Sequence, residues 1–283
     1  MIKGITTWSF EGGLENTIEV EAALKQAEDA GFQALEVCIG ESGVLAPNTT
    51  EADLARIRKA LEASPLVTET LASGFSWGAN PLDDDPEVRE KGQNLHREAL
   101  RVAGALGLRD YLFVPGVVKS PISPSTVRYD RALDRLRTFL EGLLPIAEKH
   151  DVRVGVENVW NGLFYSPVEL LEFVRSFQSE HLGIYFDVGN VLGYHQHPPH
   201  WIEILGEKII RVHVKDFKES VGTLDGFCDL LDGDVPWEES MAALRAIGYD
   251  KTLIAEMVPP WEDVIPRTSR AMDRILTMGG SHG

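Results

Sequence analysis

Residues 151–190 read DVRVGVENVWNGLFYSPVELLEFVRSFQSEHLGIYFDVGN, and the order of patterns in this stretch decides the fold. A short β-type run at 153–157 ends in a carboxylate. Ser166 and Pro167 then introduce apolar residues at helical spacing, as expected where serine caps a helix and proline occupies its first turn. A second β-type run at 183–187 also ends in a carboxylate. The stretch therefore predicts a strand, a helix and a second strand, the repeating unit of an α/β fold.

The same alternation extends along the whole chain. Glycines follow several helical segments, at Gly31, Gly107 and Gly248, where this residue commonly ends a helix. Each β-type run is followed by a segment with helical spacing. The eight predicted strands are 2–8, 34–39, 67–73, 111–115, 153–157, 183–187, 209–214 and 252–257.

Eight such units can close into a barrel or lie open as a doubly wound sheet. The first predicted strand is not followed by the glycine-rich fingerprint that binds dinucleotides in doubly wound sheets. The length of 283 residues fits one barrel, for which about 250 residues are typical. No linker or change in composition divides the chain. We therefore predict a single-domain (β/α)8 TIM barrel over residues 1–278, followed by a loose tail at 279–283.

Composition excludes several classes of function. The chain carries 27 Lys and Arg against 44 Asp and Glu, and the net charge of -17 opposes binding to nucleic acid. Two cysteines, Cys38 and Cys228, cannot build a disulfide framework or a cysteine-rich metal site, which favours a reducing compartment. The N-terminus lacks the pattern of a signal peptide, and no apolar run is long enough to span a bilayer. We expect a cytoplasmic protein that binds neither nucleic acid nor membranes.

Four predicted strands in the second half end in residues that bind metal ions: Glu157, Asp187, His213 and Glu256. Each interrupts an apolar run, so a single buried charge there would cost several kcal/mol unless it were compensated. In a TIM barrel the carboxyl ends of the strands meet at one mouth, where the four groups can share a cation. Three carboxylates and one imidazole suit Mn²⁺, Co²⁺, Mg²⁺ or Zn²⁺. A helix-capping role is the alternative for any one carboxylate taken alone.

The chain resembles the sugar-phosphate isomerase/epimerase family, the xylose isomerase-like TIM barrels. The resemblance covers nearly the whole chain and is densest from residue 151 to residue 257. The most specific motifs are FDVGN at 186–190, VHVKDF at 212–217, DGDVPW at 232–237 and IAE at 254–256.

This resemblance implies one divalent metal ion held by Glu157, Asp187, His213 and Glu256, with Glu157 and Glu256 also acting as an acid/base pair. A metal bound to adjacent carbonyl and hydroxyl oxygens acidifies the C–H bond between them and stabilises the resulting cis-enediolate. Carboxylates on opposite faces of that intermediate give epimerisation, whereas one group serving neighbouring carbons gives aldose–ketose isomerisation. The predicted function is a metal-dependent isomerase or epimerase of a ketose or ketose phosphate, of the ketose 3-epimerase or hexulose-phosphate isomerase type.

Five further residues are candidates for substrate binding. Trp8 and Trp160 lie at or just after strand ends and can pack on a sugar face, although both can equally be ordinary packing. Lys215 has the strand parity of His213 and should point to the mouth, where it can hold a substrate oxygen or a phosphate, or pair with a neighbouring carboxylate. Glu36 can bind a sugar hydroxyl or form an ion pair with Lys215. Asn190 can donate to a hydroxyl or cap a helix.

Other polar residues in the sequence do not point to a single role. The sequence has no glycine-rich loop that could bind a phosphate. The candidate phosphate contacts are Lys119, Arg128, Lys215 and Lys218. His195, His197 and His200 follow the sixth strand and form either a second metal site or an exposed histidine-rich loop.

Several alternative functions use a similar barrel. A polyol dehydratase of the inosose type or a hydroxypyruvate-type isomerase could use the same metal site. An apurinic-site endonuclease is disfavoured by the negative charge and by Asn190, which stands where its histidine-rich, three-metal pattern has a histidine. A non-catalytic sugar-binding barrel is the alternative from a different class. From the family resemblance we expect a homo-oligomer, either a dimer or a tetramer.

Overall fold

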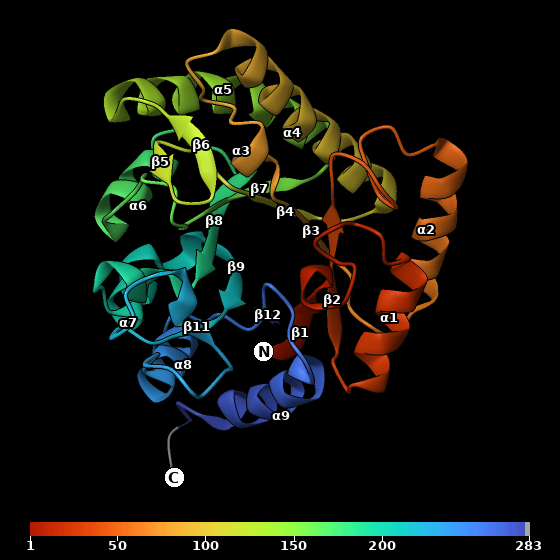
Figure 1. The fold of residues 1–283 in the computed structure, drawn as a ribbon, viewed down its shortest axis with the longest axis vertical. Helices are drawn as coiled ribbons and strands as arrows, with labels where there is room; N and C mark the ends of the chain where they lie inside the picture. Colours follow the sequence, from red (N-terminus) through yellow and green to blue (C-terminus); the bar gives the residue numbers. More distant parts are fainter. Residues whose placement is uncertain (281–283) are drawn as a thin grey trace.

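A computed structural model describes residues 1–280 and has eight parallel strands closed into a barrel (Figure 1). Around the barrel the strands follow the order β1-β12-β9-β8-β7-β4-β3-β2. Each of the eight predicted strands overlaps one of them, so the TIM-barrel prediction is confirmed. The barrel strands are β1 (Ile2–Thr6), β2 (Ala34–Ile39), β3 (Thr70–Ser73), β4 (Asp110–Phe113), β7 (Arg153–Glu157), β8 (Leu182–Asp187), β9 (Ile209–Val214) and β12 (Thr252–Ala255).

The helices surround the barrel and cover its outer face (Figure 1). Their ends follow the expected chemistry: Asp85 and Ser166 accept hydrogen bonds from backbone N–H groups of the first turn, each with proline directly after it. Gly107 ends the long helix α4 at a φ of 77°, a left-handed conformation that favours glycine. The α-helices are α1 (Val20–Asp29), α2 (Glu51–Ala63), α3 (Phe75–Gly78), α4 (Pro86–Leu106), α5 (Tyr129–Lys149), α6 (Pro167–Arg175), α7 (Pro198–Leu205), α8 (Trp237–Ala246) and α9 (Val264–Thr277).

Two small antiparallel sheets, which the sequence pattern did not predict, lie in the loops that follow barrel strands. β5 (Lys119–Ser120) pairs with β6 (Ser123–Thr126) after β4. β10 (Asp216–Phe217) pairs with β11 (Phe227–Cys228) after β9. Within residues 1–280 the remaining ordered elements are the 3-10 helices η1 (Thr7–Ser9), η2 (Asn190–Tyr194), η3 (Gly206–Lys208) and η4 (Leu224–Gly226).

Ion pairs occupy the end of the barrel where the strands begin. The Asp110 carboxylate is fully buried and lies 2.6 Å from Arg153 Nε and 2.5 Å from Arg211 Nε. Arg211 Nη2 also lies 2.5 Å from Glu69 Oε2. Two guanidinium groups thus compensate the buried carboxylate, and polar side chains fill this end. The opening to solvent lies at the opposite end, where the strands finish.

The C-terminal prediction falls partly beyond the described residues. The backbone N–H of Gly279 donates to Glu238 Oε2 at 2.8 Å, so the chain still contacts α8 at this position. The rest of the predicted loose tail includes 281–283, which lie outside the described residues. Within 1–280, no helix combines the length and the apolar character needed to cross a membrane.

Candidate metal centre and substrate cavity

The four predicted ligands meet at the mouth of the barrel. Glu157 ends β7, Asp187 ends β8, His213 lies in β9 and Glu256 directly follows β12. These strands are consecutive neighbours in the barrel, and Asp187 is in register with His213. One ligand atom from each residue lies within 4.8 Å of those from the other three, and all four residues are buried. The convergence expected from the strand ends is therefore present.

Three buried atoms of the cluster fit a divalent cation. Asp187 Oδ2, His213 Nδ1 and Glu256 Oε2 are buried, and within the described chain none of them has a well-aligned hydrogen bond. His213 Nδ1 lies only 2.7 Å from Glu256 Oε2, so these atoms point to a shared position. Buried carboxylates without full compensation are costly, and carboxylate oxygens with one imidazole nitrogen are suitable ligands for Mn²⁺, Co²⁺, Mg²⁺ or Zn²⁺. The residues present thus fit the expected ion.

The two glutamates of the cluster have opposite pKa shifts. Burial raises the pKa of Glu157 to about 8, and the nearby carboxylates of Glu256 and Asp187 add to this effect. Burial also acts to raise the pKa of Glu256, but Lys215 and His213 outweigh it and hold that pKa at about 2. Without a metal, Glu157 is therefore protonated near neutral pH while Glu256 is ionised. Two carboxyl groups with separated pKa values are the usual arrangement for acid/base chemistry.

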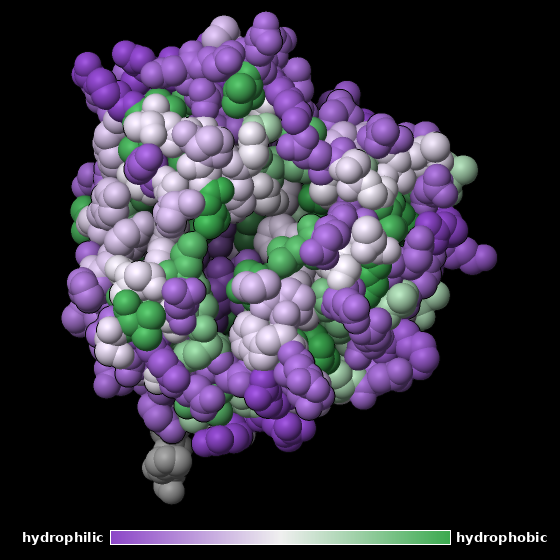
Figure 2. Space-filling model, viewed as in Figure 1, coloured by the Kyte–Doolittle hydropathy of each residue, from purple (hydrophilic) through white to green (hydrophobic). Residues whose placement is uncertain are grey.

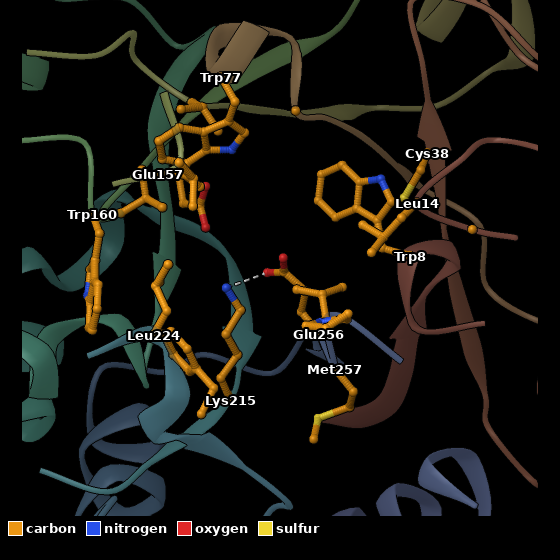
Figure 3. A pocket seen from close by; sticks show the side chains of 18 of the residues that line it. Trp8, Leu14, Cys38, Trp77, Glu157, Trp160, Lys215, Leu224, Glu256 and Met257 are labelled. Atoms are coloured by element: carbon orange, nitrogen blue, oxygen red, sulfur yellow. Dashed lines mark ion pairs between the residues drawn. The ribbon is translucent and has the colours of Figure 1, made fainter. Parts of the chain in front are cut away.

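Lys215 faces the cavity beside the cluster, as its strand parity predicted. Its Nζ atom lies 2.9 Å from Glu256 Oε2 and 3.1 Å from Asp187 Oδ2 (Figure 3 marks the ion pair with Glu256). The same atom lies 5.5 Å from the centre of the Phe227 ring. The opposing carboxylates raise the pKa of Lys215 despite its burial, which keeps the ammonium group charged. Its role toward a substrate stays a prediction.

The structure corrects both expectations for Glu36. This side chain is fully buried inside the barrel and neither lines the cavity nor pairs with Lys215. Instead, Glu36 Oε1 lies 2.8 Å from His213 Nε2, and the Tyr185 hydroxyl donates to Glu36 Oε2. The physical reason is position: Glu36 lies in the middle of β2, below the strand ends. It therefore supports His213 from behind and leaves Nδ1 facing the other ligands.

Two asparagines hold Asp187 in place. Asn158 exchanges hydrogen bonds with the backbone of Asp187, accepting from its N–H and donating to its carbonyl oxygen, both at 2.8 Å. The backbone N–H of Asn190 donates to Asp187 Oδ1 at 2.9 Å. Asn190 Nδ2 donates to the Asn158 carbonyl oxygen at 3.0 Å, and its side chain also lines the cavity. Much of the hydrogen-bonding capacity of Asn190 is thus used within the protein.

A cavity of about 570 Å³ opens above the cluster. Trp8 and Trp160 lie on opposite sides of it, as Figure 3 shows, and the hollow is visible at the centre of the face in Figure 2. Trp160 is fixed by a hydrogen bond from its Nε1 to the carbonyl oxygen of Asn190 at 2.8 Å. Sequence reasoning missed most of the wall, because isolated aromatic and aliphatic residues in loops carry no periodic signal. The additional lining residues include Leu14, Cys38, Ile122, Leu224, Phe227, Met257 and Trp261.

The three loop histidines are separate from the four-residue cluster. His197 Nε2 lies 3.1 Å from Glu239 Oε2, and the His197 and His200 rings have centres 4.6 Å apart. His195 has a φ of 56° at the end of η2. His197 and Glu239 are both substantially exposed, so the geometry agrees with the exposed-loop alternative for this segment.

The closed barrel therefore carries, at neighbouring strand ends, a buried carboxylate and histidine cluster that could hold one metal ion, at the end where TIM-barrel enzymes have their active sites. A family model described as "Xylose isomerase-like TIM barrel" matches residues 24–275, and the chain belongs to this family. The resemblance found in the sequence is thereby confirmed.

Relatives and solved structures agree with the family. D-psicose 3-epimerase from Enterocloster bolteae is 26% identical over 264 residues, covering 86% of this chain and 82% of the relative. A 3-oxo-isoapionate decarboxylase from Pectobacterium atrosepticum is 24% identical over 285 residues, covering 96% and 91%. The crystal structure of a D-tagatose 3-epimerase-like protein superposes with a TM-score of 0.79 at 21% identity, covering 99% of this chain and 98% of the other. The epimerases among these proteins are isomerases, and the predicted enzyme class is confirmed at that level.

Proposed function

We propose that this protein is a divalent-metal-dependent epimerase or isomerase of a keto sugar. The observation that carries the proposal is the buried four-residue cluster, which places the two glutamates Glu157 and Glu256 at the cavity floor. Figure 3 shows their carboxyl groups on different sides of the space beside Lys215. The sugar epimerases among the relatives support the same reaction class.

The chain's own residues supply the proton transfers. Glu256 removes a proton from the carbon next to the substrate carbonyl, and Glu157 returns one to the other face. The Lys215 ammonium donates to the substrate oxygen on which negative charge develops. Trp8 and Trp160 pack on the sugar and exclude water. A cation held by the four-residue cluster would act as a Lewis acid toward substrate oxygens.

Solvent deuterium uptake tests this proposal. The protein, reconstituted in turn with Mn²⁺, Co²⁺, Mg²⁺ and Zn²⁺, is incubated with ketoses and ketose phosphates in D₂O, and NMR locates the exchanged carbon. We expect metal-dependent exchange in the wild type and a loss of at least 100-fold in Glu157→Gln and in Glu256→Gln, the scale of acid/base catalysis. Exchange at C3 indicates an epimerase, and exchange at C1 or C2 indicates an isomerase. Glu172→Gln, an exposed glutamate on α6, is the matched control.

The alternatives predict other products. A polyol dehydratase releases water from its substrate, a hydroxypyruvate-type isomerase acts on a shorter substrate, and an apurinic-site endonuclease nicks DNA. A sugar-binding barrel shows no exchange with any compound. Undiminished exchange in both glutamine variants would contradict the acid/base assignment. A cytoplasmic location and a homo-oligomeric state remain predictions, to be tested by fractionation and by light scattering.

A further inference from the structure

The outer part of the cavity is apolar, in contrast to its floor. Leu14, Ile122 and Leu224 expose 46%, 50% and 37% of their surface, although they are large aliphatic residues. All three line the cavity. They come from three loops that are far apart in sequence: the loop after β1, the turn between β5 and β6, and η4. Single exposed leucines are ordinary, but a group gathered at one opening marks a binding surface.

Aromatic rings complete this surface. Phe227 and Trp261 line the same cavity, and Trp261 Nε1 donates to Asp229 Oδ1 at 3.0 Å, which fixes the ring. Figure 2 shows hydrophobic residues around the hollow, and Figure 3 places Leu14 and Leu224 on opposite sides of it. We call this group the apolar collar; it consists of Leu14, Ile122, Leu224, Phe227 and Trp261.

The cavity has the size of a site for a drug-sized ligand. Its volume of about 570 Å³ lies within the roughly 300–1,000 Å³ of sites that hold drug-sized ligands. The polar groups suited to a sugar, Glu157, Lys215 and Glu256, lie together at the floor, and Asn190, 3.5 Å from Glu157 through its Nδ2 atom, also lines the cavity. A single sugar ring bound there leaves the collar exposed to water. A second, apolar ring would bury it.

Charge argues against a phosphate in the outer cavity. Among the described residues that line it, Lys215 is the one cation, and its Nζ atom is already within 3.1 Å of Asp187 and 2.9 Å of Glu256. The carboxylates of Glu157 and Glu256 also line the cavity, and Glu41, a further lining residue, forms an ion pair with Lys91 at 2.5 Å. A phosphate dianion requires arginine, lysine or clustered backbone N–H groups, and beside carboxylates it would be repelled.

The other cations considered for phosphate point elsewhere. Lys119 Nζ donates to Thr126 Oγ1 at 3.3 Å, and Arg128 forms an ion pair with Asp130 at 2.5 Å. Neither residue lines the cavity, and Lys218 does not line it either.

We propose that the sugar bound by this site is unphosphorylated and carries an apolar ring substituent, as in an aryl glycoside whose keto group is on a carbon other than the anomeric one, with the sugar at the floor and the ring in the apolar collar. This inference rests on the proposed function for the nature of the sugar part. It adds the class of substituent, which the collar selects through the hydrophobic effect and ring packing.

Equilibrium binding tests the inference without requiring turnover. Quenching of tryptophan fluorescence is measured on the metal-loaded protein with phenyl β-D-glucoside, methyl β-D-glucoside and D-glucose 6-phosphate. We expect the phenyl glucoside to bind at least tenfold more tightly than the methyl glucoside, because the phenyl ring is removed from water together with the collar. The phosphate should bind no more tightly than the methyl glucoside.

Variants of the collar identify where the ring binds. Leu224→Ala and Ile122→Ala should each lower the phenyl-to-methyl affinity ratio by about threefold to tenfold, since each removes part of the apolar contact. Ile204→Ala is the matched control, an aliphatic side chain of α7 that is 39% exposed and lies away from the cavity. It should leave the ratio unchanged.

The outcomes separate this inference from the proposed function. Equal binding of the two glucosides, tighter binding of the phosphate, or a ratio unchanged in both collar variants would overturn the inference. If those results accompany metal-dependent deuterium exchange with a free ketose, the proposed function stands and only the substituent class is wrong. If the phenyl preference appears but no keto sugar exchanges, the ring site is supported and the proposed reaction fails.

Discussion

A single buried carboxylate decides which nitrogen of His213 faces the metal cluster. Glu36 Oε1 lies 2.8 Å from His213 Nε2, and both side chains are fully buried. Tyr185 donates to the other Glu36 oxygen and limits its rotation. Carboxylates placed behind a metal-binding histidine fix the orientation of its ring and increase its basicity, and their loss typically weakens metal binding about 10–100-fold.

Glu36→Gln should therefore weaken metal binding by about 10–100-fold while leaving the four ligands in place. The glutamine keeps the shape of the side chain but lacks the charge that supports His213. Titration with Mn²⁺, followed by calorimetry or electron paramagnetic resonance, measures the change, and thermal unfolding of the metal-free variant checks that it folds. Glu172→Gln serves as the control. An affinity within twofold of wild type would refute the supporting role of Glu36.

The raised pKa of Glu157 also predicts how the metal-free protein responds to pH. Burial raises this pKa from 4.5 to about 8, so the folded protein resists an ionisation that the unfolded chain accepts readily. The stability that the protonated Glu157 contributes is complete below pH 4.5, and it is lost as the pH rises through about 8. His213, whose pKa is also raised, changes stability in the same direction.

In a chelating buffer, the melting temperature should therefore fall between pH 5 and pH 8.5, and Glu157→Gln should reduce this fall. Some decline persists in the variant, because the unfolded chain releases the His213 proton as the pH rises through 6.5 while the folded protein retains it. Differential scanning calorimetry at both pH values gives the two slopes, with Glu172→Gln as reference. If the melting temperature fell equally with pH in Glu157→Gln and in wild type, the folded protein would not oppose the ionisation of Glu157.

At the scale of elements, the loop from β10 to α8 is organised around one carboxylate. Asp216 accepts hydrogen bonds from the backbone N–H groups of Leu231 and Val235 at 2.8 Å and 3.1 Å, and from Trp237 Nε1 at 2.9 Å. Gly233 lies against it, so that an added Cβ would be 2.2 Å from Asp216 Oδ1. The motif at 232–237 thus closes onto the strand end that carries Lys215.

Gly233→Ala should destabilise the protein by about 1–3 kcal/mol, the usual cost of overpacking a tight site. Besides Asp216 Oδ1, the new methyl group would meet the Phe217 backbone nitrogen at 2.6 Å, which cannot move without disturbing β10. Gly142→Ala is the control, because a Cβ added at Gly142 would meet nothing within 4 Å and alanine favours the interior of α5. Urea unfolding compares the two. Equal stabilities would contradict the close approach at Gly233.

The pattern of the strands explains which site residues could be predicted from the sequence. The barrel strands are apolar runs, and in the second half an ionisable residue interrupts each run at its end, so Glu157, Asp187, His213 and Glu256 were visible. The contact of Glu36 with His213 joins residues 177 positions apart, and no local pattern records it. β10 and β11 are too short for periodicity, and the collar residues are isolated apolar side chains in loops.

At the scale of the whole molecule, all side chains of the four-residue cluster come from one half of the barrel. Its ligands come from β7, β8, β9 and β12, four consecutive neighbours in the closed sheet, whereas β1 to β4 and their loops provide cavity walls. A bound ion would therefore cross-link the second half of the chain and compensate its buried carboxylates. Binding to the folded state alone adds about 4 kcal/mol at a free ion concentration of roughly 1,000 times Kd.

Chelation should consequently lower the melting temperature by on the order of 10 °C, since about 2–4 °C corresponds to each kcal/mol in chains of 150–250 residues. Hydrogen exchange should show where this stability resides, with amides of β8 and β9 losing more protection than those of β2 and β3. Asp187→Asn, which removes a ligand, should melt at the same temperature with and without chelator. If protection fell equally in both halves, or if the variant still responded to chelator, the ion would bind elsewhere. The four strand ends would then be a set of structural ion pairs around Lys215, and the barrel would close without a metal.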